Sequence, residues 1–129
     1  MPGTMRIDEA ATFAAVLLMA AGPKTEFGTD SQAISKSGER KWFAQVAVTY
    51  HPEYGMAAQS EVIQVTVTGG TDPALVLQPG TPVTFDGLRV GFSAPERGQG
   101  DRIRGGRPWF QAAGVRAVHG QRSAEQKAA

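Results

Sequence analysis

The chain has 129 residues, of which 41% are hydrophobic and 19% charged, and its net charge is +1 at pH 7. These values are typical of one soluble domain with a hydrophobic core of its own. Because the chain has no cysteine, disulfide scaffolds, thiol catalysis and cysteine-ligated zinc or iron–sulfur sites are excluded. A protein this close to neutral cannot coat duplex DNA through charge alone, so any nucleic-acid role must be local to a groove.

Residues 10–21 form an apolar run with the composition of a signal-peptide core. However, Asp8 and Glu9 precede it, where a signal peptide would carry basic residues. The run is also shorter than the roughly 20 apolar residues that a membrane span needs. We therefore expect a cytoplasmic protein without membrane contact. Residues 12–21 are interpreted as a buried strand, with a helix as the alternative, and residues 1–11 are expected to be frayed.

Two segments, 41–50 (KWFAQVAVTY) and 61–68 (EVIQVTVT), alternate between apolar and polar residues and predict half-exposed strands. Trp42 and Phe43 are adjacent, so they must point to opposite faces of the first of these strands. The valines of that strand share the face of Trp42, which makes Phe43 the expected exposed ring. A position for Trp42 at the rim of the sheet stays open.

Beyond these strands, glycine and proline mark each boundary. Asp72 followed by a proline predicts a single helical turn within 69–80. A fourth strand is predicted over 82–92, with a bulge or bend at its central Asp-Gly pair, and a fifth over 108–118. The tail, residues 119–129, has no apolar pattern and is expected to be disordered.

Two long loops, 22–40 and 94–106, carry most of the basic residues that are candidates for ligand contact. Residues 97–107 hold four arginines and one aspartate, a local net charge of +3 that favours an anionic partner. Aromatic residues stand beside these loops and could stack on bases. The candidate phosphate-binding residues are Lys36, Arg40, Lys41, Arg97, Arg102, Arg104 and Arg107, and the candidate stacking residues are Trp42, Phe43, Tyr54 and Trp109.

Five strands with a helical turn between the third and fourth predict an all-β fold, a five-stranded OB-like Greek-key barrel. Residues 61–91, with VIQVTVTGG, then DPALVL, then QPGTPVTFDGLRVG, are similar to the single-stranded DNA-binding protein family, particularly its small plasmid and phage members. KWFAQVAV resembles the family's second strand, and the likeness extends over residues 12–118. The tail RSAEQKAA departs from the family, whose bacterial members end in an acidic, Phe-tipped segment that recruits partners.

The resemblance implies a non-catalytic protein that binds single-stranded DNA, and the residues do not distinguish DNA from RNA. A nearly neutral domain would bind weakly alone, so a homo-oligomer is expected. No catalytic constellation, phosphate-binding loop, metal-ligand spacing or cofactor motif is recognisable, so we predict no enzyme activity, metal or small-molecule cofactor. The alternative is an OB-like accessory module of a plasmid or phage replication system, whose arginine loop and aromatics contact another protein.

Overall fold

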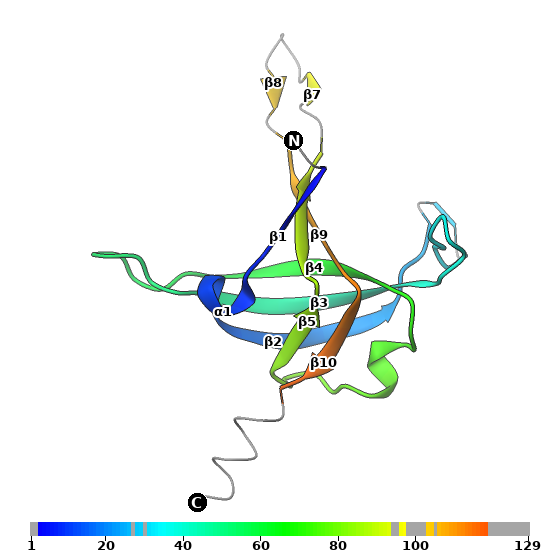
Figure 1. The fold of residues 1–129 in the computed structure, drawn as a ribbon, viewed down its shortest axis with the longest axis horizontal. Coiled ribbons are helices and arrows are strands. Elements are labelled where there is room, and N and C mark those ends of the chain that lie inside the picture. The colour runs from blue at the N-terminus through cyan, green and yellow to red at the C-terminus, as the bar shows by residue number, and fades with distance from the viewer. Residues whose placement is uncertain are drawn as a thin grey trace, which may run out of the picture.

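The computed structural model describes residues 3–26, 28–29, 31–93, 96–97, 103–104 and 106–118, and shows a mostly-β fold (Figure 1). The strands are β1 (Thr4–Arg6), β2 (Phe13–Pro23), β3 (Lys41–Tyr50), β4 (Ser60–Thr68), β5 (Val83–Asp86), β6 (Arg89–Phe92), β7 (Glu96–Arg97), β8 (Ile103–Arg104), β9 (Pro108–Ala112) and β10 (Gly114–Ala117). The helical elements are α1 (Glu9–Thr12) and a single 3₁₀ turn, η1 (Pro73–Leu75).

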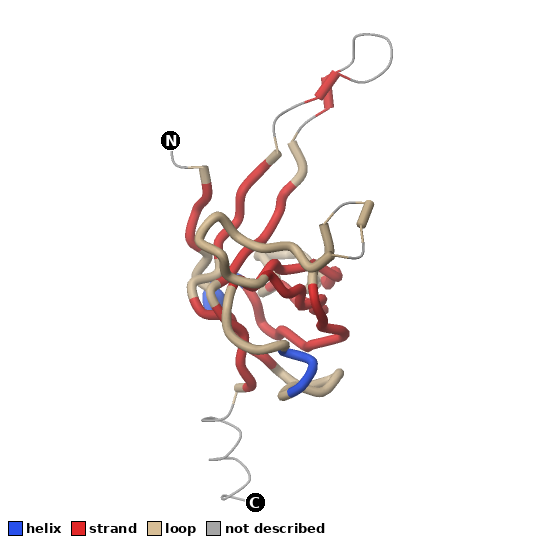
Figure 2. The backbone as a smooth tube through the Cα atoms, turned by 90° about the vertical axis from the view of Figure 1, so that its right-hand side faces the viewer, coloured by secondary structure: helices blue, strands red, loops and turns tan. Residues whose placement is uncertain are grey.

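Six strands form one mixed sheet in the order β1-β6-β9-β4-β3-β2. All of its neighbours are antiparallel except β4 and β9, which run parallel. β5 and β10 form a separate pair that crosses in front of β2 and β3, so the two sheets make two layers (Figures 1 and 2). β7 and β8 pair in a small hairpin beyond β6 and β9.

The core lies between these layers. On β3, alternate residues from Trp42 to Val48 are buried, and on β4 the buried residues are Ile63, Val65 and Val67. The second layer contributes Val83 and Phe85. The period-two alternation predicted for these two strands is therefore confirmed, and burial of one face explains why their register is well defined.

β2 also contacts the segment that leads into β5. Leu17 and Pro82 form an isolated antiparallel bridge. The Leu18 amide donates to the Thr81 carbonyl (2.9 Å), and the Gly80 amide donates to the Leu18 carbonyl (2.6 Å). The free edge of the six-stranded sheet is thus joined to the second layer at one point, just after η1.

The N-terminus differs from the expectation of a frayed segment. β1 pairs with β6, and α1 is capped by Asp8, whose carboxylate accepts from the Ala11 amide (3.1 Å). The Glu9 carboxylate accepts from the Phe85 amide (3.1 Å) and the Thr84 hydroxyl (3.2 Å). A three-residue strand carries no detectable periodicity, and its partners are far away in sequence, so composition could not reveal it.

Two predicted strands are each divided in two. The strand predicted over 82–92 breaks at Gly87, which has a φ of +64°, and its halves enter different sheets as β5 and β6. The strand predicted over 108–118 divides in the same way into β9 and β10. Within residues 12–21 the strand begins at Phe13, and the helical alternative holds only up to Thr12. The expectation of a buried strand is wrong: β2 is an edge strand, and most of its residues are exposed or half-buried because only one of its faces packs against the core. The tail 119–129 lies outside the described residues.

Candidate nucleic-acid interface

The face of the six-stranded sheet that points away from β5 and β10, here called the outer face, carries a continuous row of polar and aromatic residues. The pairing register places its members side by side on neighbouring strands: Phe43, Thr66, Gln111 and Arg89. Gln45 and Gln64 form a second pair beside this row. These side chains are half-buried or exposed, so they are available to a ligand.

Two rings on the outer face lie over glycines of the adjacent strand. Gly22 pairs with Phe43, and a Cβ on Gly22 would lie 3.2 Å from the phenylalanine ring. Gly91 pairs with Trp109, and a Cβ there would overlap the indole. Because glycine has no side chain, each ring can lie across its neighbour's backbone. Trp109 remains 41% exposed, so its ring offers a surface for stacking.

A groove of about 400 Å³ runs beside Trp109, where β4 begins to pair with β9. Its walls include Lys24, Gln64, Thr66 and Trp109. The Lys24 ammonium donates to the Thr66 hydroxyl (2.7 Å). Burial, together with the nearby charge of Lys41, lowers the pKa of Lys24. No sequence signal marks Lys24, because a lone lysine after a Gly-Pro pair has no distinguishing pattern.

The predicted cations of the first loop lie at one end of this face. Lys41 is half-buried at the start of β3, two residues from Phe43 and on its side of the strand. Lys36 and Arg40 are exposed in the segment before it. Arg40 pairs with Ile34 in an isolated bridge, which shapes this loop as a small hairpin.

The second basic loop rises from β6 and β9. The Arg107 amide donates to the Ser93 hydroxyl (2.8 Å), and the Ser93 amide donates to the Arg107 carbonyl (2.9 Å), so the base of the loop is closed. Arg97 and Arg104 belong to β7 and β8, which lean toward the side of the outer face (Figure 2). Arg102 lies outside the described residues.

Two of the predicted stacking residues are not part of this surface. Trp42 is 7% exposed and belongs to the core, where its indole N–H has no hydrogen-bond partner among the described residues. Tyr54 is fully exposed on the hairpin between β3 and β4, at the opposite end of the sheet from the 24–40 segment (Figure 1). The structure therefore brings together Phe43, Trp109 and the Lys41 end, and separates Tyr54 from them.

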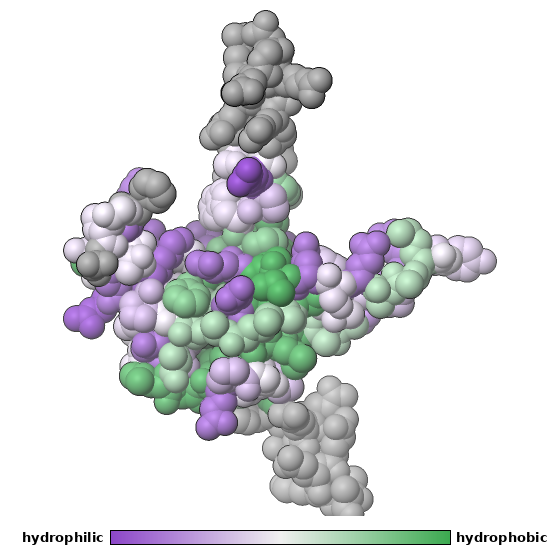
Figure 3. All heavy atoms as spheres, turned by 180° about the vertical axis from the view of Figure 1, so that it is seen from behind, coloured by the Kyte–Doolittle hydropathy of each residue, from purple (hydrophilic) through white to green (hydrophobic). Residues whose placement is uncertain are grey.

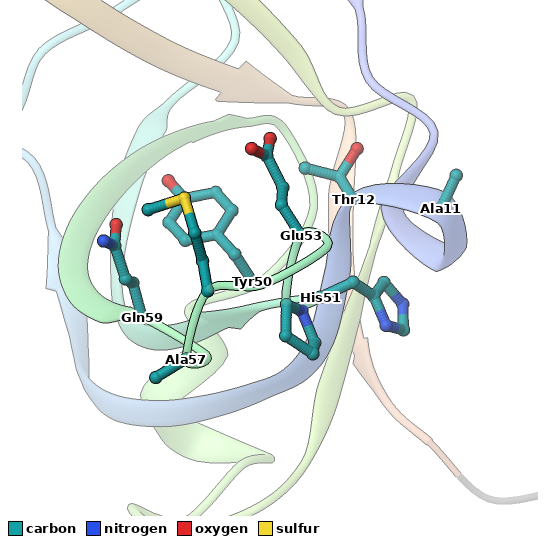
Figure 4. Close-up of a pocket in the computed structure, with 9 residues that line it drawn as sticks. Ala11, Thr12, Tyr50, His51, Glu53, Ala57 and Gln59 are labelled. Atoms are coloured by element: carbon teal, nitrogen blue, oxygen red, sulfur yellow. The ribbon is translucent and has the colours of Figure 1, made fainter.

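A second hollow, of about 550 Å³, lies between that hairpin and α1 (Figure 4). Tyr50, His51 and Glu53 line it. The Tyr50 hydroxyl donates to the Glu61 carboxylate, and burial together with this bond raises the pKa of Tyr50 to about 12. The His51 ring bonds to the Ala10 carbonyl (2.8 Å). These bonds tie the hairpin to α1 and β4, so they have a structural role.

Comparisons of the chain with protein-family models, with curated proteins and with solved structures find no match. Across the described part of the chain, no group of three or more His, Asp or Glu side chains is placed to hold a metal ion. No helix within those same residues is long and apolar enough to cross a membrane. What the fold and the site define is a mostly-β protein with an aromatic and polar sheet face between two basic loops.

Proposed function

We propose that this chain is an OB-like Greek-key barrel that binds single-stranded DNA without catalysis and without strong sequence preference. The barrel is supported by the β2-β3-β4 meander, the parallel contact of β4 with β9 and the bridge from Leu17 to Pro82. The turn η1 lies between β4 and β5, at the place where OB folds carry a helix.

One observation carries the proposed function: Phe43 and Trp109 lie on the same outer face, each over a glycine, with glutamine and threonine side chains between them. Aromatic rings on a sheet face stack on bases of any sequence, and each stack contributes about 1–3 kcal/mol. Gln45, Gln64, Thr66 and Thr68 would supply hydrogen bonds to the bases. Such a face explains binding without sequence selection.

The basic loops would provide the electrostatic part of binding. Lys36, Arg40 and Lys41 stand at one border of the outer face, and Arg107 stands at the base of the second loop, to which Arg97, Arg102 and Arg104 belong. About four phosphate contacts give a slope of log K against log salt near −3 for a single strand. Trp42 has no part in this mechanism because it is in the core.

Self-association is a second element of the proposal. Leu17, Ala47 and Val62 form a row across β2, β3 and β4, and Leu17 and Val62 are 40% and 50% exposed. Figure 3, which views the molecule from the side opposite to Figure 1, shows hydrophobic side chains near the centre of this face, with polar ones around them. Burial of this row between copies would raise the avidity of a nearly neutral domain for a long strand.

A protein-interaction module is the competing function, and the hairpin between β3 and β4 favours it. Tyr54 is fully exposed there and Met56 is 55% exposed, and tyrosine is a frequent anchor of protein interfaces. A partner bound at this hairpin would leave the outer face untouched. The two functions are therefore separable by mutation.

The test is fluorescence anisotropy with a labelled dT oligonucleotide of about 30 bases, long enough for several OB-sized sites, at low and at moderate salt. We expect binding that weakens with salt. Trp109→Ala should weaken it by about 1–3 kcal/mol, while Trp109→Phe should retain most of the affinity.

Arg116→Ala is the matched control for Arg102→Ala and Arg104→Ala. Arg116 is exposed on β10, where it pairs with Asp86 (3.0 Å) in the layer opposite the outer face. The control should bind as the wild type does, and the two loop variants should bind more weakly. If the wild type does not bind at low salt, the proposal is wrong. If a protein partner is captured by the wild type and by the loop variants but not by Tyr54→Ala, the interaction module is the better description.

A further inference from the structure

The groove beside Trp109 contains a cation that the sequence did not single out. Lys24 follows β2, and its backbone amide donates to the Lys41 carbonyl (3.1 Å), which fixes the start of its side chain. Its ammonium then reaches the Thr66 hydroxyl (2.7 Å) on β4. Since Thr66 lies between Phe43 and Gln111 in the cross-strand row, this charge is held on the strand between the two ring-bearing strands.

The ammonium keeps donors for an anion, and Glu61, the carboxylate that lines the same groove, accepts a hydrogen bond from the Tyr50 hydroxyl. An ammonium has three donors, and the Thr66 hydroxyl accepts from only one of them. Within the described residues, no carboxylate lies within ion-pair distance of Lys24. Burial and the charge of Lys41 disfavour the charged form and lower the pKa of Lys24. A bound anion would offset both effects.

The separation of the two rings indicates which part of a bound single strand would lie beside Lys24. Phe43 is on β3 and Trp109 on β9, with β4 between them, so their backbones are two strand spacings apart, about 10 Å, and the rings, which lie over Gly22 on β2 and Gly91 on β6, are farther apart still. Consecutive bases of a stacked strand rise by about 3.4 Å. Bases bound to the two rings therefore cannot be stacked on each other, and the backbone that joins them must cross β4.

We propose that Lys24 binds an internucleotide phosphate of a single strand at the point where its backbone crosses β4 between the bases on Phe43 and Trp109. This inference rests on the proposed function and adds to it a residue, a ligand atom and a path for the strand. Thr66 orients the ammonium, which lies half-buried in the groove. The strand is thus bound in an extended form over the sheet.

The test compares Lys24→Met and Lys24→Arg with the wild type, using the same dT oligonucleotide across a salt series. Lys24→Met should bind about tenfold more weakly at low salt, and its salt slope should be smaller by about 0.7, the value of one phosphate contact on a single strand. Lys24→Arg should restore the slope. Arg116→Gln, which also removes one positive charge but lies in the other layer, should leave the slope unchanged.

A second oligonucleotide, with uncharged methylphosphonate linkages, separates charge from packing. The wild type and Lys24→Met should bind this probe equally, because no phosphate charge is present for Lys24 to neutralise. A Lys24→Met defect that persists on the neutral probe, or an unchanged salt slope on the phosphate probe, overturns the inference while the proposed function stands. Absence of wild-type binding to the phosphate probe at low salt overturns the proposed function itself.

Discussion

At the scale of single residues, Trp109 and Gly91 form one unit. The indole covers the glycine, so Gly91 is buried although it lies on the outer face, and the ring is supported from below by backbone. A ring supported in this way loses little freedom when a base stacks on it, because it is already held in place. In the proposed binding mode, Gly91 would therefore contribute to affinity because it has no side chain.

Gly91→Ala tests this pairing, with Gly22→Ala as the matched control. A Cβ at Gly91 would overlap the Trp109 indole, whereas at Gly22 it would lie 3.2 Å from the Phe43 ring. We expect Gly91→Ala to lower the free energy of unfolding by about 1–3 kcal/mol, as overpacking does, and Gly22→Ala to lower it less. Urea unfolding measures both; equal losses would show that the indole moves aside without cost.

The sequence predicted some of these residues and not others, for physical reasons. Strand alternation separated Trp42 from Phe43, and the valines identified the buried face, so Phe43 was selected correctly as the ring outside the core. The same logic could not separate Trp109 from Phe110, because their neighbours are small or polar. Lys24 could not be predicted, since its role depends on Thr66, which is 42 residues away in the chain.

At the scale of elements, α1 is attached to the second layer by one carboxylate. The carboxylate oxygens of Glu9 accept hydrogen bonds from the Phe85 amide and the Thr84 hydroxyl. For the Phe85 amide, the carboxylate takes the place that a backbone carbonyl of a neighbouring strand would have. Burial raises the pKa of Glu9 above its usual 4.5, although the hydrogen bonds from Phe85 and Thr84 act in the opposite direction. The charged form is therefore held less favourably in the folded protein than in the unfolded chain.

This shift gives a pH prediction. An acid whose folded pKa is raised stabilises the fold most below its unfolded pKa, and that contribution is lost as the pH rises through the folded pKa. Glu9→Gln removes the titration but keeps an acceptor for the Phe85 amide. The free energy of unfolding of Glu9→Gln minus that of the wild type should therefore be higher at pH 7 than at pH 4. Urea unfolding of both proteins at each pH measures this difference.

Glu9→Ala provides the control, because it removes both the charge and the acceptor. It should destabilise the protein at either pH, since the Phe85 amide is left without its partner. A difference between Glu9→Gln and the wild type that does not change between pH 4 and pH 7 would contradict the assignment of the raised pKa to this carboxylate.

Elements with strong local signals were predicted within a residue or two, and the rest depended on distant partners. β3 matches its predicted bounds, and η1 begins where Asp72 precedes a proline. The division of 82–92 into β5 and β6 was anticipated only as a bend, because a change of sheet depends on which strands lie on either side. β1 was not predicted for the same reason, because it forms only by pairing with the edge of β6.

At the scale of the whole molecule, the outer face has two parts of different composition. One part carries the rings and the cations, and the other carries the apolar row of Leu17, Ala47 and Val62. Val62 also lines the groove beside Trp109, so the two parts adjoin. Association through the apolar row would therefore bring the proposed strand-binding surfaces of two copies close together.

Val62→Lys tests the association. Val62 is 50% exposed in the single chain, so a lysine there should cost the monomer little, whereas its charge would be desolvated in an interface between copies. We expect light scattering to show an oligomer for the wild type and a monomer for Val62→Lys. Ala113→Lys, an exposed position next to β10, should leave the oligomer intact; a monomeric wild type at micromolar concentration would rule out association through this row.

The placement of the two tryptophans has a practical consequence for spectroscopy. Trp42 is enclosed in the core and Trp109 is on the surface, so the two emit from dry and from wet surroundings. In a Trp109→Phe variant, the remaining emission would report the integrity of the fold alone, while in the wild type the quenching expected from a base stacked as proposed would come from Trp109. The chain thus contains separate optical reporters of folding and of ligand contact, and neither requires a label.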